Sequence, residues 1–93
     1  HIDMHNNLIE KIDIPNIKNL DSLILGYNRL TSIENLRNTL NLTVLDINNN
    51  KIEIFPPEIF LLNKLKTLNI QNNSINDIPS LLALNLNLVR LNI

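Results

Sequence analysis

The chain has 93 residues, a formal net charge of −1 and no cysteine. Its length predicts one domain, and its near-neutral charge gives no electrostatic reason for binding nucleic acid or an acidic membrane. The lack of cysteine excludes a thiol nucleophile, a cysteine-ligated zinc site and disulfide bonds, and it favours a reducing, intracellular compartment, cytoplasmic or nuclear.

One pattern of apolar residues followed by an asparagine recurs along the chain. The asparagines stand at positions 7, 28, 50 and 73, so each follows the last at a nearly constant interval. A regular period of this size predicts a solenoid, in which each repeat buries its apolar face against the next. The copies in chain order are Ile2, Met4, Asn7 and Ile9; Leu20, Leu23, Leu25, Asn28 and Leu30; Leu42, Leu45, Ile47, Asn50 and Ile52; Leu65, Leu68, Ile70, Asn73 and Ile75; and Leu88, Leu91 and Ile93.

This spacing resembles the leucine-rich-repeat family, whose pattern is L-x-x-L-x-L-x-x-N-x-L. Residues 32–36 (SIENL) resemble the 22-residue subclass of a protein phosphatase 1 regulatory subunit, and residues 55–59 (FPPEI) resemble the 23-residue, Ras-suppressor-like subclass. The resemblance implies an α/β fold: a right-handed horseshoe fragment with a short-stranded parallel sheet on the concave face and turns or 3-10 segments on the convex face.

The repeats divide the chain into one domain, 1–93, with units 1–19, 20–41, 42–64 and 65–87 and a truncated fifth unit, 88–93. Because the repeats at the two ends lack the polar residues of a capping repeat, we expect the chain to be an excerpt of a longer protein. Self-association through the uncapped ends is the alternative, since Leu88, Leu91 and Ile93 would form an uncovered apolar edge.

Within each unit, alternation of apolar and polar residues predicts a strand of three or four residues. Leu45 and Ile47 point inward, while Asp46 and Asn48 point outward. Behind the strands, the prolines exclude a regular helix, so we expect turns and 3-10 segments with at most one helical turn over 58–62.

The recurring asparagines have a structural explanation. A buried amide both donates and accepts hydrogen bonds, so it can join the backbone turn of its own repeat to that of a neighbour. We therefore predict that Asn7, Asn28, Asn50 and Asn73 form a structural ladder and bind no ligand.

The outward strand positions and the loop after each strand are the contact positions that the resemblance implies for a partner protein. Acidic residues occupy the early strands and basic residues the late ones, which would orient a partner; the alternative is a merely solvated surface. Tyr27 is the only tyrosine and is a candidate hot spot, although it could simply pack on Asn49. The candidate residues are Asp3, His5, Asp21, Ile24, Tyr27, Asp46, Asn48, Lys66, Asn69, Gln71 and Arg90.

An enzymatic reading has little support in the sequence. Gly26 is the only glycine, so there is no phosphate-binding glycine loop, and no catalytic triad motif is present. His1, Asp3 and His5 share one face of an extended strand, but we interpret them as exposed polar residues and expect no metal and no cofactor.

The sequence therefore predicts a non-enzymatic scaffold that binds another protein, with no nucleic acid and no membrane as partner. The alternative is a substrate-recruiting arm of a larger enzyme or signalling protein (a ligase, a kinase or a phosphatase regulator) whose catalytic part lies elsewhere.

Overall fold

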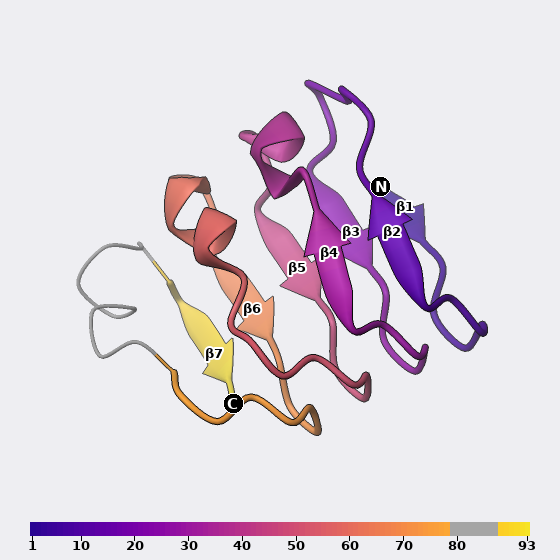
Figure 1. Ribbon diagram of the computed structural model, residues 1–93. Helices are drawn as coiled ribbons and strands as arrows, with labels where there is room; N and C mark the ends of the chain where they lie inside the picture. The colour runs from indigo at the N-terminus through magenta and orange to yellow at the C-terminus, as the bar shows by residue number, and fades with distance from the viewer. Residues whose placement is uncertain (79–87) are drawn as a thin grey trace.

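The computed structural model describes residues 1–78 and 88–93 of the chain. The later part of the predicted unit 65–87, including Pro79, lies outside the described residues. Five short strands form one parallel sheet in the order β1-β3-β5-β6-β7 (Figure 1). Their bounds are Ile2–Asp3 (β1), Ser22–Ile24 (β3), Val44–Asp46 (β5), Thr67–Asn69 (β6) and Arg90–Asn92 (β7).

The register of this sheet follows the repeat. Leu23, Leu45, Leu68 and Leu91 are consecutive partners across the strands, and the first three are buried. Because side chains alternate along a strand, the residues on either side of these leucines point to the opposite face. The predicted solenoid is thus confirmed, with strands of two or three residues.

The opposite face of this sheet is called the open face here. Its residues are half-buried or exposed, whereas the leucines between them are buried in β3, β5 and β6. The open face consists of Asp3 in β1, Ser22 and Ile24 in β3, Val44 and Asp46 in β5, Thr67 and Asn69 in β6, and Arg90 and Asn92 in β7.

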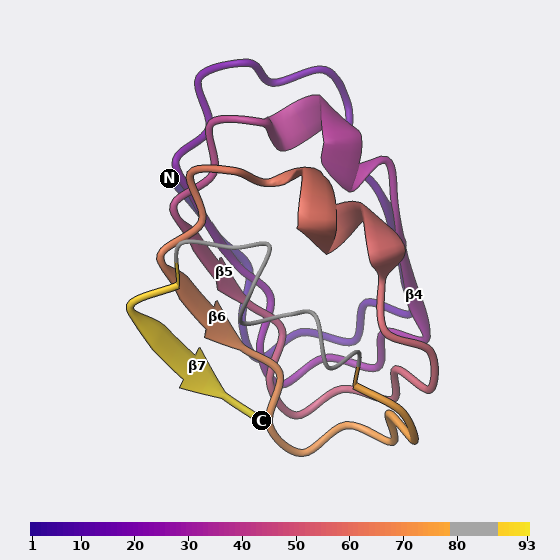
Figure 2. The same ribbon diagram turned by 90° about the vertical axis from the view of Figure 1, so that its left-hand side faces the viewer.

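A second parallel sheet lies on the other side of the coil, where the sequence predicted only turns and 3-10 segments (Figure 2). It contains β2 (Lys11–Asp13) and β4 (Ser32–Glu34), and the Ile14 N–H donates to the Glu34 carbonyl at 2.9 Å. The sheet ends after two strands. Pro56 stands where the next repeat would place the equivalent of Glu34, and it has no N–H to donate to the preceding strand.

Two 3-10 helices follow in the second and third repeats: η1 (Leu36–Thr39) and η2 (Pro57–Leu61). The prediction of 3-10 segments is confirmed, and the described residues contain no α-helix. The carboxylate of Glu58 links the two, since its Oε2 accepts the Arg37 backbone N–H at 2.9 Å and the Arg37 Nε–H at 3.0 Å.

The core between the two sheets is a single cluster of aliphatic side chains with Phe55. Leu45, Leu68, Ile59 and Leu62 are completely buried within it, which leaves the interior filled by the chain itself. Every buried side-chain nitrogen or oxygen among the described residues has a hydrogen-bond partner. No helix in this part of the chain has the length and apolar character needed to cross a membrane.

Candidate functional site

The asparagine positions hold the coil together. Asn50 Nδ2 donates to the carbonyls of Leu25 at 3.0 Å and Ile47 at 3.1 Å, and its Oδ1 accepts the Leu30 N–H at 2.9 Å. One amide therefore bonds the turn of its own repeat and that of the preceding one. Because leaving such buried backbone groups unpaired costs about 1–3 kcal/mol each, the side chain is committed to the fold.

The neighbouring asparagines repeat this arrangement, except at the start of the chain. Asn28 reaches back to the Met4 carbonyl at 3.0 Å, and Asn73 reaches back to the Ile47 carbonyl at 2.9 Å. Asn7 is exposed and bonds only the carbonyls of Met4 and His5 within its own repeat. The ladder thus joins the repeats from Asn28 onward.

The residue before each ladder asparagine has a left-handed backbone. The φ angles are 59° at Asn6, 57° at Tyr27, 51° at Asn49 and 56° at Asn72. Asparagine tolerates this region better than most residues, whereas a bulky side chain is strained in it. Tyr27 is therefore the unusual member of this set.

A shallow hollow of about 280 Å³ lies on the open face, where β1, β3 and β5 end. It gathers six of the candidate residues from three different repeats, together with Gly26, which the sequence analysis did not select. The lining residues are Asp3, His5, Ile24, Gly26, Tyr27, Asp46 and Asn48.

Two carboxylates flank the hollow, and each is held by its own loop. Asp3 Oδ1 accepts from the His5 backbone N–H at 3.2 Å and from its ring Nδ1 at 2.5 Å. These hydrogen bonds, the side-chain one first, hold the pKa of Asp3 below its ordinary value of 3.8. Asp46 Oδ1 accepts from the Asn48 N–H at 3.1 Å and from its Nδ2 at 2.6 Å.

Gly26 leaves room for Asn48, which lies directly over it. A Cβ at position 26 would come within 3.0 Å of Asn48 Oδ1. The same oxygen accepts from Asn49 Nδ2 at 2.7 Å, so Asn48 is fixed on both sides while it holds Asp46. A lone glycine in a sequence gives no sign of this packing, which depends on a side chain of the next repeat.

The remaining candidates lie elsewhere on the sheet. The Lys66 carbonyl accepts the Val89 and Arg90 N–H groups, which places both basic residues toward the amino ends of the last two strands. Asn69 continues the row of Ile24 and Asp46, and its Oδ1 accepts the Gln71 N–H at 3.2 Å. Asp21, Lys66, Asn69, Gln71 and Arg90 do not line the hollow.

No cluster of three or more His, Asp or Glu side chains arranged to hold a metal ion occurs within residues 1–78 and 88–93. Asp3 and His5 pair with each other instead. The arrangement offers hydrogen-bonding and charged groups on an open surface, which suits recognition.

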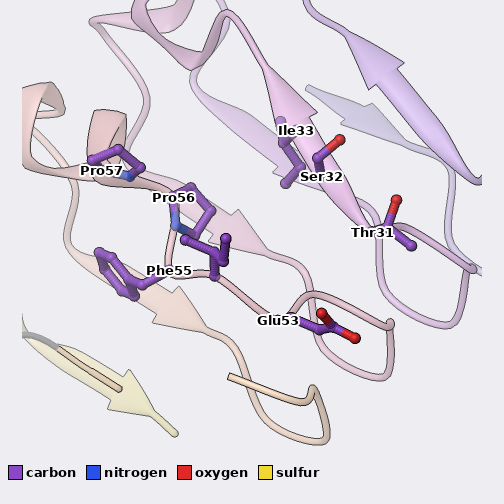
Figure 3. Close-up of a pocket in the computed structure, with 8 residues that line it drawn as sticks. Thr31, Ser32, Ile33, Glu53, Phe55, Pro56 and Pro57 are labelled. Carbon is purple, nitrogen blue, oxygen red and sulfur yellow. The ribbon is translucent and has the colours of Figure 1, made fainter. Parts of the chain in front are cut away.

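A second hollow, of about 340 Å³, lies on the other side of the coil where the small sheet ends (Figure 3). Phe55, Pro56 and Pro57 line it on one side, and Ser32 and Ile33 of β4 line it on the other. Its lining is mainly apolar, and Glu53 is the only ionisable residue in it. It contains none of the candidate residues.

Comparison with known proteins gives the family. The family model for leucine-rich repeats in two copies matches residues 18–58 and again 40–83. A human protein, "Leucine-rich repeats and immunoglobulin-like domains protein 3", is 40% identical over 67 residues. That match covers 67% of this chain and 6% of the human protein, so the chain spans a small part of that relative's length. No solved structure matches the chain significantly.

The matched model does not separate the two subclasses that residues 32–36 and 55–59 resemble, and that assignment stays a prediction. Leucine-rich repeats are in general protein-interaction modules. With the repeat, the parallel sheet and the asparagine positions in register, the chain belongs to the leucine-rich-repeat family.

Proposed function

We propose that the open face binds another protein and that Tyr27 stands at the centre of the contact. The observation that supports this proposal is that Tyr27 is 56% exposed and lies on a strained, left-handed backbone beside the hollow. Tyrosine is enriched at the energetic centres of protein interfaces because it offers a large rigid ring and a hydroxyl group.

The strain at Tyr27 supports this role. The equivalent corners at Asn6, Asn49 and Asn72 use the residue that adopts a left-handed backbone most easily. A tyrosine there costs stability of the order of 1 kcal/mol. Its ring is not buried in the core, so packing does not offset that cost. Contact with a partner would offset it.

The size of the surface bears on the extent of the contact. Five strands spaced about 4.7–4.9 Å apart span roughly 20 Å. A standard interface takes about 800 Å² from each partner, which is more than a sheet of this width presents. We therefore expect the partner also to contact surface beyond the described strands.

The test is capture of a partner from the native lysate by the full chain. The informative variant is Tyr27→Asn, because asparagine suits the left-handed backbone and keeps the fold. We expect it to lose most of the captured protein while its melting temperature stays equal or rises.

The matched control is Leu40→Ser, which removes an exposed apolar side chain (54%) directly after η1, away from the sheet. It should capture the partner as well as the unchanged chain does. Equal capture by Tyr27→Asn and the unchanged chain would remove Tyr27 from the interface. Loss of capture by Leu40→Ser alone would move the interface to the other side of the coil.

A further inference from the structure

We infer that the hollow on the open face receives an arginine side chain of the partner, held between Asp3 and Asp46 and against Tyr27. This inference rests on the proposed function, since it names the group that the same face recognises. It is carried by the register of the strands, by the hydrogen bonds of the two carboxylates and by the apolar surface between them.

The register sets the spacing of the two acids. Asp3 pairs with Ile24 across β1 and β3, and Ile24 pairs with Asp46 across β3 and β5. The carboxylates therefore stand two strands apart, at roughly 9–10 Å between Cα atoms, with Ile24 between them.

A guanidinium group suits this spacing better than an ammonium group. Its N–H donors form a planar fork that points in opposite directions, so one arginine can donate to two acceptors on its two sides. The lysine ammonium is a compact point charge with a strong hydration shell, and it would pair with one carboxylate at a time. The geometry therefore favours arginine.

Each carboxylate keeps one oxygen for a ligand. The hydrogen bonds from His5 and Asn48 both go to the Oδ1 atoms of their aspartates. Within the described residues neither Oδ2 accepts a hydrogen bond from the protein. The loops thus fix the direction of both side chains before a partner arrives, which lowers the entropy lost on binding.

The surface between the acids suits the rest of an arginine side chain. Ile24 is half-buried and offers an apolar floor for the methylene groups. Tyr27 lines the same hollow with an exposed ring, on which a guanidinium can stack. Among the lining residues His5 is the only cationic candidate, and its ring is already engaged by Asp3 Oδ1.

The test uses a small probe and needs no knowledge of the partner. Acetyl-arginine amide is titrated into the full chain while backbone amide shifts are followed by NMR, with acetyl-citrulline amide as the uncharged control of nearly equal shape. We expect saturable shifts at Ile24, Tyr27, Asp46 and Asn48 with arginine and at least tenfold weaker binding of citrulline. Acetyl-lysine amide should bind several-fold more weakly than arginine.

The matched variants are Asp46→Asn and Asp77→Asn. Asp46→Asn keeps an oxygen for the Asn48 hydrogen bonds and should weaken arginine binding at least fivefold with little change in melting temperature. Asp77→Asn removes an exposed carboxylate that does not line the hollow, and arginine binding should be unchanged.

Equal shifts with arginine and citrulline, or equal binding to both variants, would overturn the inference. If the arginine probe fails while Tyr27→Asn still abolishes capture, only the arginine assignment falls. If the probe binds while Tyr27→Asn captures the partner normally, the hollow is a cation site and the proposed interface is wrong.

Discussion

The two sheets of this solenoid are built from the same repeats, yet one crosses every described repeat and the other stops after two strands. In the five-stranded sheet the strands from β3 onward pair at the same three positions, with a buried leucine in the middle of β3, β5 and β6. In the two-stranded sheet Ile12 pairs with Ile33, and the next equivalent residue, Phe55, is followed by Pro56.

The difference shows what keeps a parallel sheet in register. The larger sheet has backbone donors at every position and a ladder of asparagine amides that ties each turn to the one before. In the smaller sheet Asn35 bonds Asp13 and Asn38 bonds the Ile14 carbonyl across the two repeats, but Pro56 offers no donor for a third strand, so one proline is enough to end it. The stability of the molecule should therefore be concentrated along the larger sheet.

The largest expected effect comes from truncating a central leucine. Leu45→Ala removes a completely buried side chain from the middle of the larger sheet and should lower the free energy of unfolding by about 2–5 kcal/mol. Ile33→Ala at the end of the smaller sheet should lie at the low end of that range. Urea denaturation of both variants measures this, and equal losses would mean that the two sheets contribute alike.

A smaller effect is expected from the ladder. Asn50→Leu leaves the buried Leu30 N–H without its acceptor, at a cost of about 1–3 kcal/mol, whereas the Leu25 carbonyl keeps its hydrogen bond from Asn28. The melting temperature should fall with no change in open-face contacts. Asn7→Leu is the control, because this exposed asparagine bonds only its own repeat, and its melting temperature should hardly change. An unchanged melting temperature in Asn50→Leu would contradict the ladder.

A still smaller effect on stability is expected from restoring a backbone N–H donor beside the smaller sheet. Pro56→Ala supplies an N–H beside β4, and this new amide should exchange slowly with solvent because it can pair with the Ile33 carbonyl. The gain of a hydrogen bond, about 0.5–1.5 kcal/mol, should nearly offset the roughly 0.4–1 kcal/mol lost through a more flexible unfolded chain. Rapid exchange of the new amide would show that something other than proline ends the sheet.

The smallest effect concerns the link between the two 3-10 helices. Desolvation raises the pKa of Glu58, but hydrogen bonds from the Arg37 side chain and backbone outweigh it, so the pKa lies below its ordinary value of 4.5. Because the folded-state pKa is lowered, the stabilisation is complete above pH 4.5 and is lost as the pH falls through the folded-state value.

Glu58→Gln should cost less than about 1 kcal/mol at neutral pH, since Arg37 is two-thirds exposed at its side chain (66%). The difference between variant and unchanged chain should disappear in acid. Thermal unfolding at pH 7 and pH 3 measures it. A difference that persists unchanged at pH 3 would assign the effect to packing and not to charge.

The sequence predicted the larger sheet because its signal is local and repeated. The leucines at 23, 45 and 68 and the asparagines at 28, 50 and 73 each mark the same place in a repeat. The smaller sheet was missed because Lys11–Asp13 and Ser32–Glu34 mark the same place in two repeats only, and in the next repeat Pro56 stands at the position of Glu34.

Prediction of the candidate site was also uneven. The repeat pattern and the family resemblance together placed Asp3, Ile24 and Asp46 on one face, and the strand register brings them side by side. The role of Gly26 and the commitment of one oxygen of each aspartate to its own loop depend on side-chain conformations, which no periodicity encodes.

The asparagine corners also determine where this molecule can gain or lose residues. In β3, β5 and β6 the interval from the first residue of the strand to its asparagine is the same, as from Ser22 to Asn28 and from Thr67 to Asn73. The interval from an asparagine to the next strand is not constant, since the stretch from Asn50 to Thr67 is longer than that from Asn7 to Ser22. Single-codon insertions and deletions behind the sheet are thus absorbed by turns and 3-10 segments, whereas one residue added before an asparagine would turn the strand over. The back of the coil can therefore differ in length from one repeat to the next while the spacing of the residues on the open face stays the same.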